Sequence, residues 1–421
     1  MTSPSSWLCI LLLGAATGAL TACSGSGGPL QLVFSSDRKL DGTDALNANR
    51  TTNIWLVKAD GNGLTALTNA TAAQVSSATP EWSANGSKIV FISSRKLDGT
   101  DALNLNATAN VWKVDPNGTG LAALTIATAA GVDHEFPHWS PNGMSVVFDS
   151  NRKPDGTDAA NINGTRNIWR VNADGTNLRP LTSATGIYAD SRDPQWSPDG
   201  TKIAFNSSRR LDGTDVGALV VNVWRVNSDG TIVVPITRTT NTPNFDPQWS
   251  RDGTKVLFTS YRALDGTDAS AVPPVSNLWQ VNADGTGLLP LTNSTARGAD
   301  NFSGQWAPDG SKIVFASTRK LDGSDAANTN STANIWRVNS DGTGLMPLTR
   351  TTAMSAGSAG PRWSHDGTKV VFISARNPDG TDSQEPNFSV NIWFMNADGS
   401  GLRPITTSRS GALNTSPAFG P

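Results

Sequence analysis

The stretch WSPDGTKIAFNSSRRLDGTD, residues 196–215, contains two phrases that recur along the chain. The phrase W-[SA]-x-[DN]-G occurs six times, with its tryptophan at Trp82, Trp139, Trp196, Trp249, Trp306 and Trp363. The phrase F-x-S-x-R-x-x-D-G-[ST]-D occurs seven times, starting at Phe34, Phe91, Phe148, Phe205, Phe258, Phe315 and Phe372. Its copies are 57 residues apart, except for one step of 53 residues between Phe205 and Phe258. A constant period indicates one structural unit repeated along the chain.

A third phrase, N-x-W, completes each repeat and is followed by a turn such as NADG and then by PLT or a close variant. Its tryptophans are Trp55, Trp112, Trp169, Trp224, Trp279, Trp336 and Trp393. Around Trp196 the segments DPQWS, KIAFNSS, NVWRVN and IVVPIT read as four short β-strands separated by Gly, Asn and Asp turns. One such sheet cannot bury both of its faces, and the repeated Trp and Phe have the size to fill gaps between packed sheets. We predict an all-β fold, a seven-bladed β-propeller of four-stranded antiparallel blades over residues 30–421.

The two ends of the repeat array complement one another. The first repeat starts at LQLVFSSD, residues 30–37, and lacks a W-S-x-D-G strand, whereas the C-terminus carries an additional SPAF, residues 416–419, where P-x-W would be expected. We predict that this C-terminal strand joins blade one and closes the ring. Closure would remove the open sheet edges that otherwise promote aggregation.

The phrase W-S-P-D-G-x-K-I-x-F, at Trp196 to Phe205, resembles the TolB-type, WD-like propeller repeat. The resemblance covers almost all of the chain beyond the N-terminal segment, and it implies the propeller fold. It implies no single function, because proteins with this repeat include periplasmic scaffolds, peptidase gating domains and sugar lyases. The repeat here is longer than is usual in that family, with the added length between the second and third strands.

The N-terminus predicts export and a lipid anchor. In residues 1–22, MTSPSS is followed by the apolar run WLCILLLGAATGALTA, which ends in small residues as a signal peptide does. Leu20-Thr21-Ala22-Cys23 resembles the bacterial lipobox, which implies diacylation of Cys23 and cleavage just before it. Residues 23–29 would then be the lipidated cysteine and a flexible Gly/Ser linker. A plain secretory signal with an incidental cysteine is the alternative, since the segment before the apolar run has no Lys or Arg.

Charge and location restrict the partners. The formal net charge is -2 and the chain has no basic run, so we expect no nucleic-acid partner. The lipid would attach the protein to a membrane, and we expect a monomer in the bacterial cell envelope, in the periplasm or at the outer membrane.

Acidic and amide residues recur in and after the D-G-[ST]-D phrase in blades one, two, three, six and seven, whereas blades four and five keep only the two Asp. Clustered oxygens in a tight loop are what Ca²⁺ requires, and this makes calcium the one cofactor hypothesis. The alternative is that these side chains form Asx-turns and pair with the repeated arginine, for example Arg38. The candidate metal ligands are Asp41, Asp44, Asn47, Asn49, Asp98, Asp101, Asn104, Asn106, Asp155, Asp158, Asn161, Asn163, Asp322, Asp325, Asn328, Asn330, Asp379, Asp382, Glu385 and Asn387.

A second set of candidates lies where the repeat is broken. In each blade the second-to-third loops and the blade-to-blade connections open on the same face, here called the loop-rich face. Residues unique to one connection carry more functional information than residues shared by all blades. The candidate ligand-binding residues are Asp133, His134, Glu135, His138, Tyr188, Asp190, Arg192, Asp193, Phe245, Asp246, Arg297, Asp300 and Phe302.

No motif in the chain predicts catalysis. There is no G-x-S-x-G elbow and no phosphate-binding or dinucleotide-binding glycine motif, so we assign no catalytic residue. We predict a non-enzymatic binding scaffold that recognises a protein or a glycan through its loop-rich face. The alternatives are a metal-dependent polysaccharide lyase or hydrolase, with His134, His138 and His365 as the available histidines, and a propeller with structural calcium sites.

Overall fold

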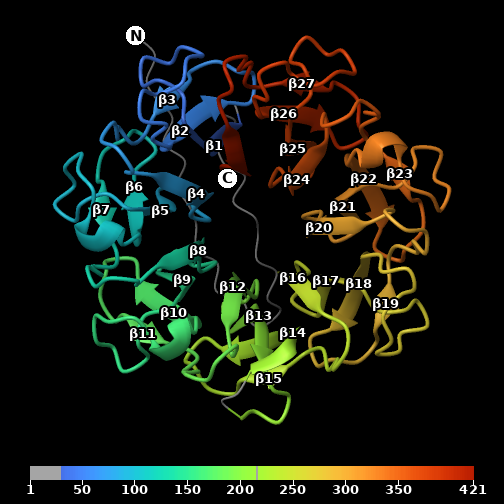
Figure 1. Ribbon diagram of the computed structural model, residues 1–421, viewed down its shortest axis with the longest axis horizontal. Helices are drawn as coiled ribbons and strands as arrows, with labels where there is room; N and C mark the ends of the chain where they lie inside the picture. The colour runs from blue at the N-terminus through green and yellow to red at the C-terminus, as the bar shows by residue number, and fades with distance from the viewer. Residues whose placement is uncertain (1–29, 215–216) are drawn as a thin grey trace, which may run out of the picture.

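The computed structural model describes residues 30–214 and 217–421, which form seven four-stranded antiparallel sheets arranged around a central axis (Figure 1). The predicted signal peptide, Cys23 and the linker lie outside the described residues. Blade one consists of β28, β1, β2 and β3, and the other blades are consecutive groups of four strands from β4–β7 to β24–β27. The predicted seven-bladed propeller is confirmed.

Each blade contributes one strand to each of four concentric layers. The inner strands are β4 Ser77–Trp82, β8 His134–Trp139, β12 Ser191–Trp196, β16 Asn244–Trp249, β20 Asn301–Trp306, β24 Ser358–Trp363 and β28 Asn414–Phe419. The second strands are β1 Gln31–Ser36, β5 Ile89–Ser93, β9 Ser145–Ser150, β13 Lys202–Arg209, β17 Lys255–Ser260, β21 Lys312–Ser317 and β25 Lys369–Ser374. The third strands are β2 Asn53–Lys58, β6 Asn110–Val114, β10 Asn167–Asn172, β14 Gly217–Asn227, β18 Asn277–Asn282, β22 Asn334–Asn339 and β26 Asn391–Asn396. The outer strands, of two residues each, are β3 Thr65–Ala66, β7 Ala122–Ala123, β11 Arg179–Pro180, β15 Val234–Pro235, β19 Leu289–Pro290, β23 Met346–Pro347 and β27 Arg403–Pro404.

The core lies between neighbouring blades. The phenylalanine of F-x-S and the tryptophan of N-x-W are direct cross-strand partners, as with Phe34 and Trp55, which are 0% and 1% exposed. The next residues along the two strands, Val33 and Ile54, point to the opposite face and pack with Phe91 of blade two. Alternation within each strand therefore joins every blade to both of its neighbours.

A buried asparagine holds each outer strand in place. In blade six the Asn334 Oδ1 accepts hydrogen bonds from the Thr349 hydroxyl at 2.9 Å and the Thr351 amide at 2.7 Å, while its Nδ2 donates to the Thr351 carbonyl at 2.8 Å. The Thr349 Oγ1 also accepts from the Ile335 amide at 2.9 Å. This arrangement, the asparagine clamp, explains why the sequence repeats both N-x-W and the Thr of PLT. Its asparagines are Asn53, Asn110, Asn167, Asn222, Asn277, Asn334 and Asn391.

The C-terminal strand closes the ring as predicted. β28 pairs antiparallel with β1, with Leu32 opposite Phe419 and Ser36 opposite Asn414. Phe419 is 5% exposed and packs in one cluster with Phe34 and Trp55 of blade one. The inner strand of the first blade is thus supplied by the far end of the chain.

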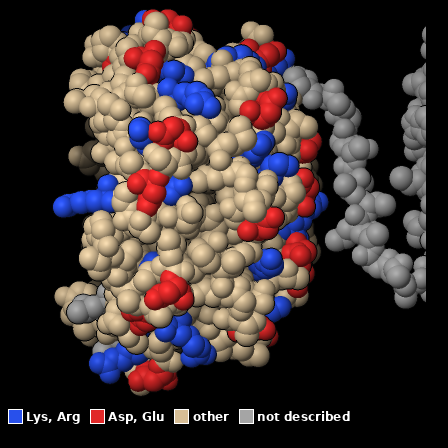
Figure 2. All heavy atoms as spheres, turned by 90° about the vertical axis from the view of Figure 1, so that its right-hand side faces the viewer, with Lys and Arg blue, Asp and Glu red and all other residues tan. Residues whose placement is uncertain are grey.

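Among the described residues the only helical segments are three 3-10 turns in the second-to-third loops, at Leu105–Ala107, Ile162–Gly164 and Thr329–Ser331. Across residues 30–214 and 217–421, no helix has the length and apolarity needed to cross a bilayer. Figure 2, which shows the side of the ring that carries β22 and β23, shows acidic and basic side chains interspersed over that wall.

Deleting residues 412–421 should destabilise the whole ring. The deletion removes β28, exposes the edge of β1 and removes Phe419, whose loss alone should cost about 3–5 kcal/mol, as for a buried Phe→Ala change. Chemical denaturation followed by circular dichroism should show a large drop in the unfolding midpoint. Deleting Pro421 alone is the control, because it leaves β28 in place. An unchanged midpoint in the longer deletion would show that the ring does not depend on β28.

Asn334→Ala should lower the free energy of unfolding by about 2–4 kcal/mol, because the Thr351 backbone groups lose their buried partners. Asn339→Ala is a matched control in the same strand, since the Asn339 side chain bonds the exposed Thr343 hydroxyl. Equal effects of the two substitutions in urea titrations would argue against the asparagine clamp.

Candidate functional site

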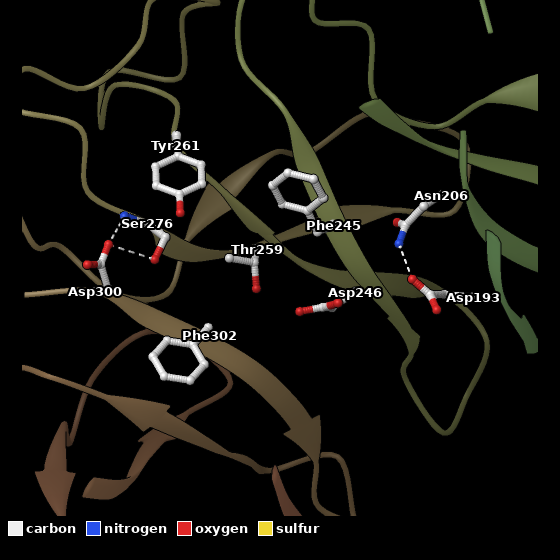
Figure 3. A pocket seen from close by; sticks show the side chains of 9 residues that line it. All are labelled: Asp193, Asn206, Phe245, Asp246, Thr259, Tyr261, Ser276, Asp300 and Phe302. Carbon is white, nitrogen blue, oxygen red and sulfur yellow. Dashed lines mark hydrogen bonds between the residues drawn. The ribbon is translucent and has the colours of Figure 1, made fainter. Parts of the chain in front are cut away.

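A pocket of about 410 Å³ opens on the loop-rich face over blades four to six (Figure 3). Five candidate residues from three different connections and inner strands meet in it: Asp193, Phe245, Asp246, Asp300 and Phe302. Sequence reasoning missed its other lining residues, which are Asn206, Thr259, Tyr261 and Ser276. A volume of this size suits a small molecule or a side chain of a partner.

The pocket lies where one connection is shorter than the rest. Trp224 and Trp249 are 25 residues apart, whereas the corresponding tryptophans are 27 residues apart from Trp55 to Trp82 and from Trp279 to Trp306. The connection into blade five is therefore two residues shorter than the connections into blades two and six. Less chain covers the loop-rich face at this point.

The shortened connection also loses a polar link present in other blades. In blade six the Thr318 hydroxyl donates to the Gly298 carbonyl at 2.7 Å and accepts from the Asp300 amide at 2.9 Å. In blade three Asn151 makes the same two bonds, to the Gly131 carbonyl and from the Asp133 amide, at 2.6 and 2.7 Å.

The residue of blade five at the position of Thr318 and Asn151 is Tyr261, whose ring lines the pocket instead. Tyr261 thus replaces the side chain that makes this hydrogen-bonded link in blades three and six. A shortened connection and an aromatic residue coincide in one blade, and together they leave the pocket open.

Aromatic rings stand on both sides of the pocket. Phe245 and Tyr261 meet edge to face, with ring centroids 6.5 Å apart and an interplanar angle of 87°. Figure 3 shows Phe302 across from them, with Thr259 and Asp246 between the two sides. Phe245 and Phe302 are half-buried, so their rings are available for contact with a ligand.

Three carboxylates give the pocket a negative charge. Asp246 is in contact with solvent, yet protein surrounds much of its carboxylate, and this loss of hydration together with the neighbouring Asp193 raises the pKa of Asp246 to about 6. Burial also raises the pKa of Asp193, whose Oδ2 accepts a hydrogen bond from the side-chain amide of Asn206 at 2.9 Å. The Asp300 carboxylate accepts from the Ser276 amide at 2.8 Å and from its hydroxyl at 3.0 Å.

Two buried polar atoms of the pocket lining have no hydrogen-bond partner within the described chain. They are the Asn206 Oδ1 and the Thr259 Oγ1, on side chains 7% and 4% exposed. Buried polar atoms nearly always have a partner in native proteins. Their placement in a pocket therefore points to a partner that comes from outside the chain.

The blade-three candidates form a network beside the pocket, joined to it by the Asp193 backbone amide, which donates to Asp149 at 3.4 Å. Arg166 bridges the buried Asp149 at 2.8 Å and Glu135 at 2.9 Å, and burial raises the pKa of Asp149. His134 is fully buried with its Nδ1 2.8 Å from the Ser150 hydroxyl, and burial lowers its pKa to about 4. The structure places His134 in the framework rather than in the pocket.

The other histidines lie elsewhere. His138 pairs with Glu81 of the preceding inner strand through its Nδ1, and its Nε2 is 3.0 Å from the Gln195 Nε2. His365 lies in the turn between β24 and β25, which opens on the opposite face from the second-to-third loops. The histidines of the enzyme hypothesis are therefore not brought together.

The remaining candidates do not line the pocket. Asp133 bonds Asn151 through its backbone amide, and Tyr188 is 64% exposed in the connection into blade four. Arg192 is exposed and pairs with Asp190 at 3.4 Å, and Arg297 is also exposed.

The aspartates of the D-G-[ST]-D loops make backbone contacts. Asp98, the first of its pair, accepts from the Thr100 amide at 2.9 Å and its hydroxyl at 2.6 Å, which is an Asx-turn. Asp101, the second, accepts from the Thr71 amide at 2.9 Å and ties the loop to the neighbouring connection. Asn104 and its counterparts donate their side-chain amides to carbonyls such as that of Ala127, at 2.9 Å.

These contacts agree with the Asx-turn interpretation of the loops. The repeated arginine joins in, since Arg152 lies 3.5 Å from Asp158 and Arg319 lies 3.6 Å from Asp325. Within the described ranges, no group of three or more His, Cys, Asp or Glu side chains is placed to hold a metal ion.

The repeats and the fold have known counterparts. No family model matches the chain. It is 31% identical over 144 residues to the protein TolB homolog of Chlorobium luteolum, a match that covers 30% of this chain and 32% of that one. The fold is a TolB-like β-propeller.

The TolB-like propeller is also similar to enzymes. It is 26% identical over 166 residues to the uncharacterized peptidase YuxL of Bacillus subtilis, covering 37% of this chain and 22% of that protein. A solved oligogalacturonate lyase in complex with manganese superimposes with a TM-score of 0.53 and 17% identity, covering 90% of this chain and 85% of the lyase. The chain spans less than two fifths of the curated relatives it matches, so these likenesses establish the fold and leave the function open.

Calcium addition tests the metal hypothesis for the loops of the TolB-like propeller. Because the loop carboxylates already accept backbone hydrogen bonds, we expect 5 mM CaCl₂, added to chelator-treated protein, to leave the melting temperature unchanged. Ligand binding to the folded state alone would raise it by mass action. MgCl₂ at the same ionic strength is the control. A rise specific to calcium would establish a site in the folded protein.

Proposed function

We propose that this protein is a non-enzymatic binding scaffold of the bacterial cell envelope, which recognises a protein or a glycan through its loop-rich face. The pocket over blades four to six carries this proposal. It combines half-buried aromatic rings, such as Phe302, with polar groups that have no internal partner, such as the Thr259 hydroxyl. Recognition sites typically combine an apolar lining with a few convergent polar groups.

The position of the pocket supports binding rather than a packing defect. Seven nearly identical blades would give a uniform rim, yet a shortened connection and an aromatic residue in place of a polar link coincide at this pocket. Scaffolds with a rigid framework commonly carry their recognition residues on the loops that the framework positions. The export signal and lipid attachment at Cys23 remain part of the proposal, and they would place this face in the envelope.

A metal-dependent polysaccharide-active enzyme is the competing class. Such an enzyme needs side chains that converge on a metal ion or a pair of groups for proton transfer. Here His134 is buried in blade three, and His138 is tied to Glu81. These positions favour the binding scaffold.

Pocket variants test the proposal directly. Immobilised protein is incubated with envelope extract, and captured material is compared between wild type and a Phe245→Ala/Tyr261→Ala/Phe302→Ala triple variant. Capture of a specific component should fall at least tenfold in the triple variant, because the aromatic contact area is lost. Treating the extract with protease or with periodate shows whether that component is a protein or a glycan.

The matched control is Phe136→Ala. Phe136 lies in the inner strand of blade three, is 39% exposed and is outside the pocket. Capture should be unchanged in this variant. Equal capture by the wild type and the triple variant, both shown to be folded by circular dichroism, would remove the pocket from consideration as the recognition site.

A further inference from the structure

The pocket and its counterpart in blade three differ in one informative way. Arg166 and Ser276 occupy the same repeat position, directly before the asparagine of N-x-W. The Arg166 backbone amide donates a hydrogen bond to the Asp190 carboxylate at 2.8 Å, and the Ser276 backbone amide donates to the Asp300 carboxylate at 2.8 Å. The backbone around the two positions is therefore organised in the same way.

Blade three supplies its own cation at this position. The Arg166 guanidinium reaches between Asp149 and Glu135, at the second-strand and inner-strand positions that Thr259 and Phe245 occupy in blade five. In blade five the short Ser276 side chain leaves that space open, and the pocket occupies it. Within one molecule, the same repeat position is therefore filled by an arginine side chain in blade three and left open in blade five.

The open form carries excess negative charge. Among the described residues, Asp193, Asp246 and Asp300 take part in no ion pair within 4.0 Å, although three carboxylates line one pocket. Arg362 of β24 lowers the pKa of Asp246, and His138 and Arg192 lower that of Asp193, but none of these three side chains lines the pocket. A cation in the pocket would relieve the repulsion between these carboxylates.

The unpartnered Asn206 Oδ1 needs a ligand that donates a hydrogen bond. The Asn206 Oδ1 is an acceptor without a partner, while the Asn206 Nδ2 and the Ser276 hydroxyl already donate to Asp193 and Asp300. Lysine and arginine side chains carry donors and no acceptor, whereas sugar hydroxyls also need donors from the protein. The Thr259 hydroxyl can donate or accept, so the preference for an ammonium or guanidinium group over a sugar comes from the three carboxylates of the lining.

The aromatic rings favour an organic cation over a metal ion. Phe245, Tyr261 and Phe302 offer faces or edges rather than ligand oxygens, and rings attract ammonium and guanidinium groups by cation–π contact. No group of metal-binding side chains is found in the described ranges. Partners of the polypeptide class present such cations on long, flexible side chains.

We propose that the pocket binds the side chain of a lysine or arginine presented by a polypeptide partner. The proposal rests on the proposed binding function and identifies the chemistry that this site recognises. The ligand group occupies the place that the Arg166 guanidinium occupies in blade three, with its charge facing Asp246 and Asp300 and its stem against the aromatic rings.

Titration with small probes tests the proposal. Nα-acetyl-lysine methylamide and Nα-acetyl-arginine methylamide are added to the full-length protein, and binding is followed by isothermal titration calorimetry. Nα-acetyl-norleucine methylamide is the neutral isostere, and glucosamine with glucose probes a glycan origin of the cation. We expect at least one of the two basic probes to bind at least tenfold more tightly than norleucine and glucosamine.

Variants locate the binding. Asp246→Asn and Asp300→Asn should each weaken the basic probes at least tenfold, while Asp133→Asn, the counterpart of Asp300 in blade three, should leave binding unchanged. Ser276→Arg places an internal guanidinium at the position of Arg166 and should abolish probe binding while the protein remains folded by circular dichroism. Its failure to fold would leave the two Asp→Asn variants as the test.

The outcomes separate the two proposals. Equal binding of norleucine and lysine probes, or binding that survives both Asp→Asn substitutions, would overturn the cation assignment. Tighter binding of glucosamine than of either basic probe would also overturn it and indicate a glycan ligand. Capture that depends on the aromatic residues, without any binding of basic probes, would leave the scaffold function standing and remove this inference.

Discussion

The propeller depends on a buried asparagine in each blade. The outer strands have two residues each, too few to remain paired by their own backbone hydrogen bonds. Asn334 and its counterparts replace the missing ladder, since one amide group bonds the backbone beyond the outer strand on both its donor and acceptor sides. Such a polar group is costly inside a core unless every bond is made, which explains why Asn and Thr are repeated together.

A framework of this kind is uniform and therefore carries little information about function. The connections differ beyond the residue that the asparagine clamp bonds, such as Thr351, because the clamp makes no contact there. In blade five the connection is shorter and Tyr261 stands where Thr318 stands in blade six, so a structural link is replaced by an open pocket. The pocket thus forms where a hydrogen-bonded contact of the repeat is absent. The neighbouring blades keep that contact and hold the sides of the pocket in place.

Most of the fold could be predicted from the sequence, because the Trp and Phe spacing and the orphan SPAF segment report packing and closure directly. Five of the candidate ligand-binding residues line the pocket, on the connections and inner strands where the repeat is broken. Thr259 and Asn206 were missed because they lie within the repeated F-x-S phrase. The signal was their polarity, shared with Ser35 and Asp149, at a position that is Ile92, Ala316 or Ile373 in the other three blades. Tyr261 had a signal as well, as one of two tyrosines in the chain.

Grouping residues by sequence proximity was misleading for blade three. His134, Glu135 and His138 are adjacent in the chain, yet strand alternation and the bulge between Glu135 and His138 send them to different environments. Glu135 pairs with Arg166, His138 pairs with Glu81, and His134 is buried in the core. In a propeller, residues that act together come from neighbouring blades at matching repeat positions. Comparison between blades, as between Arg166 and Ser276, is therefore more informative than comparison along the chain.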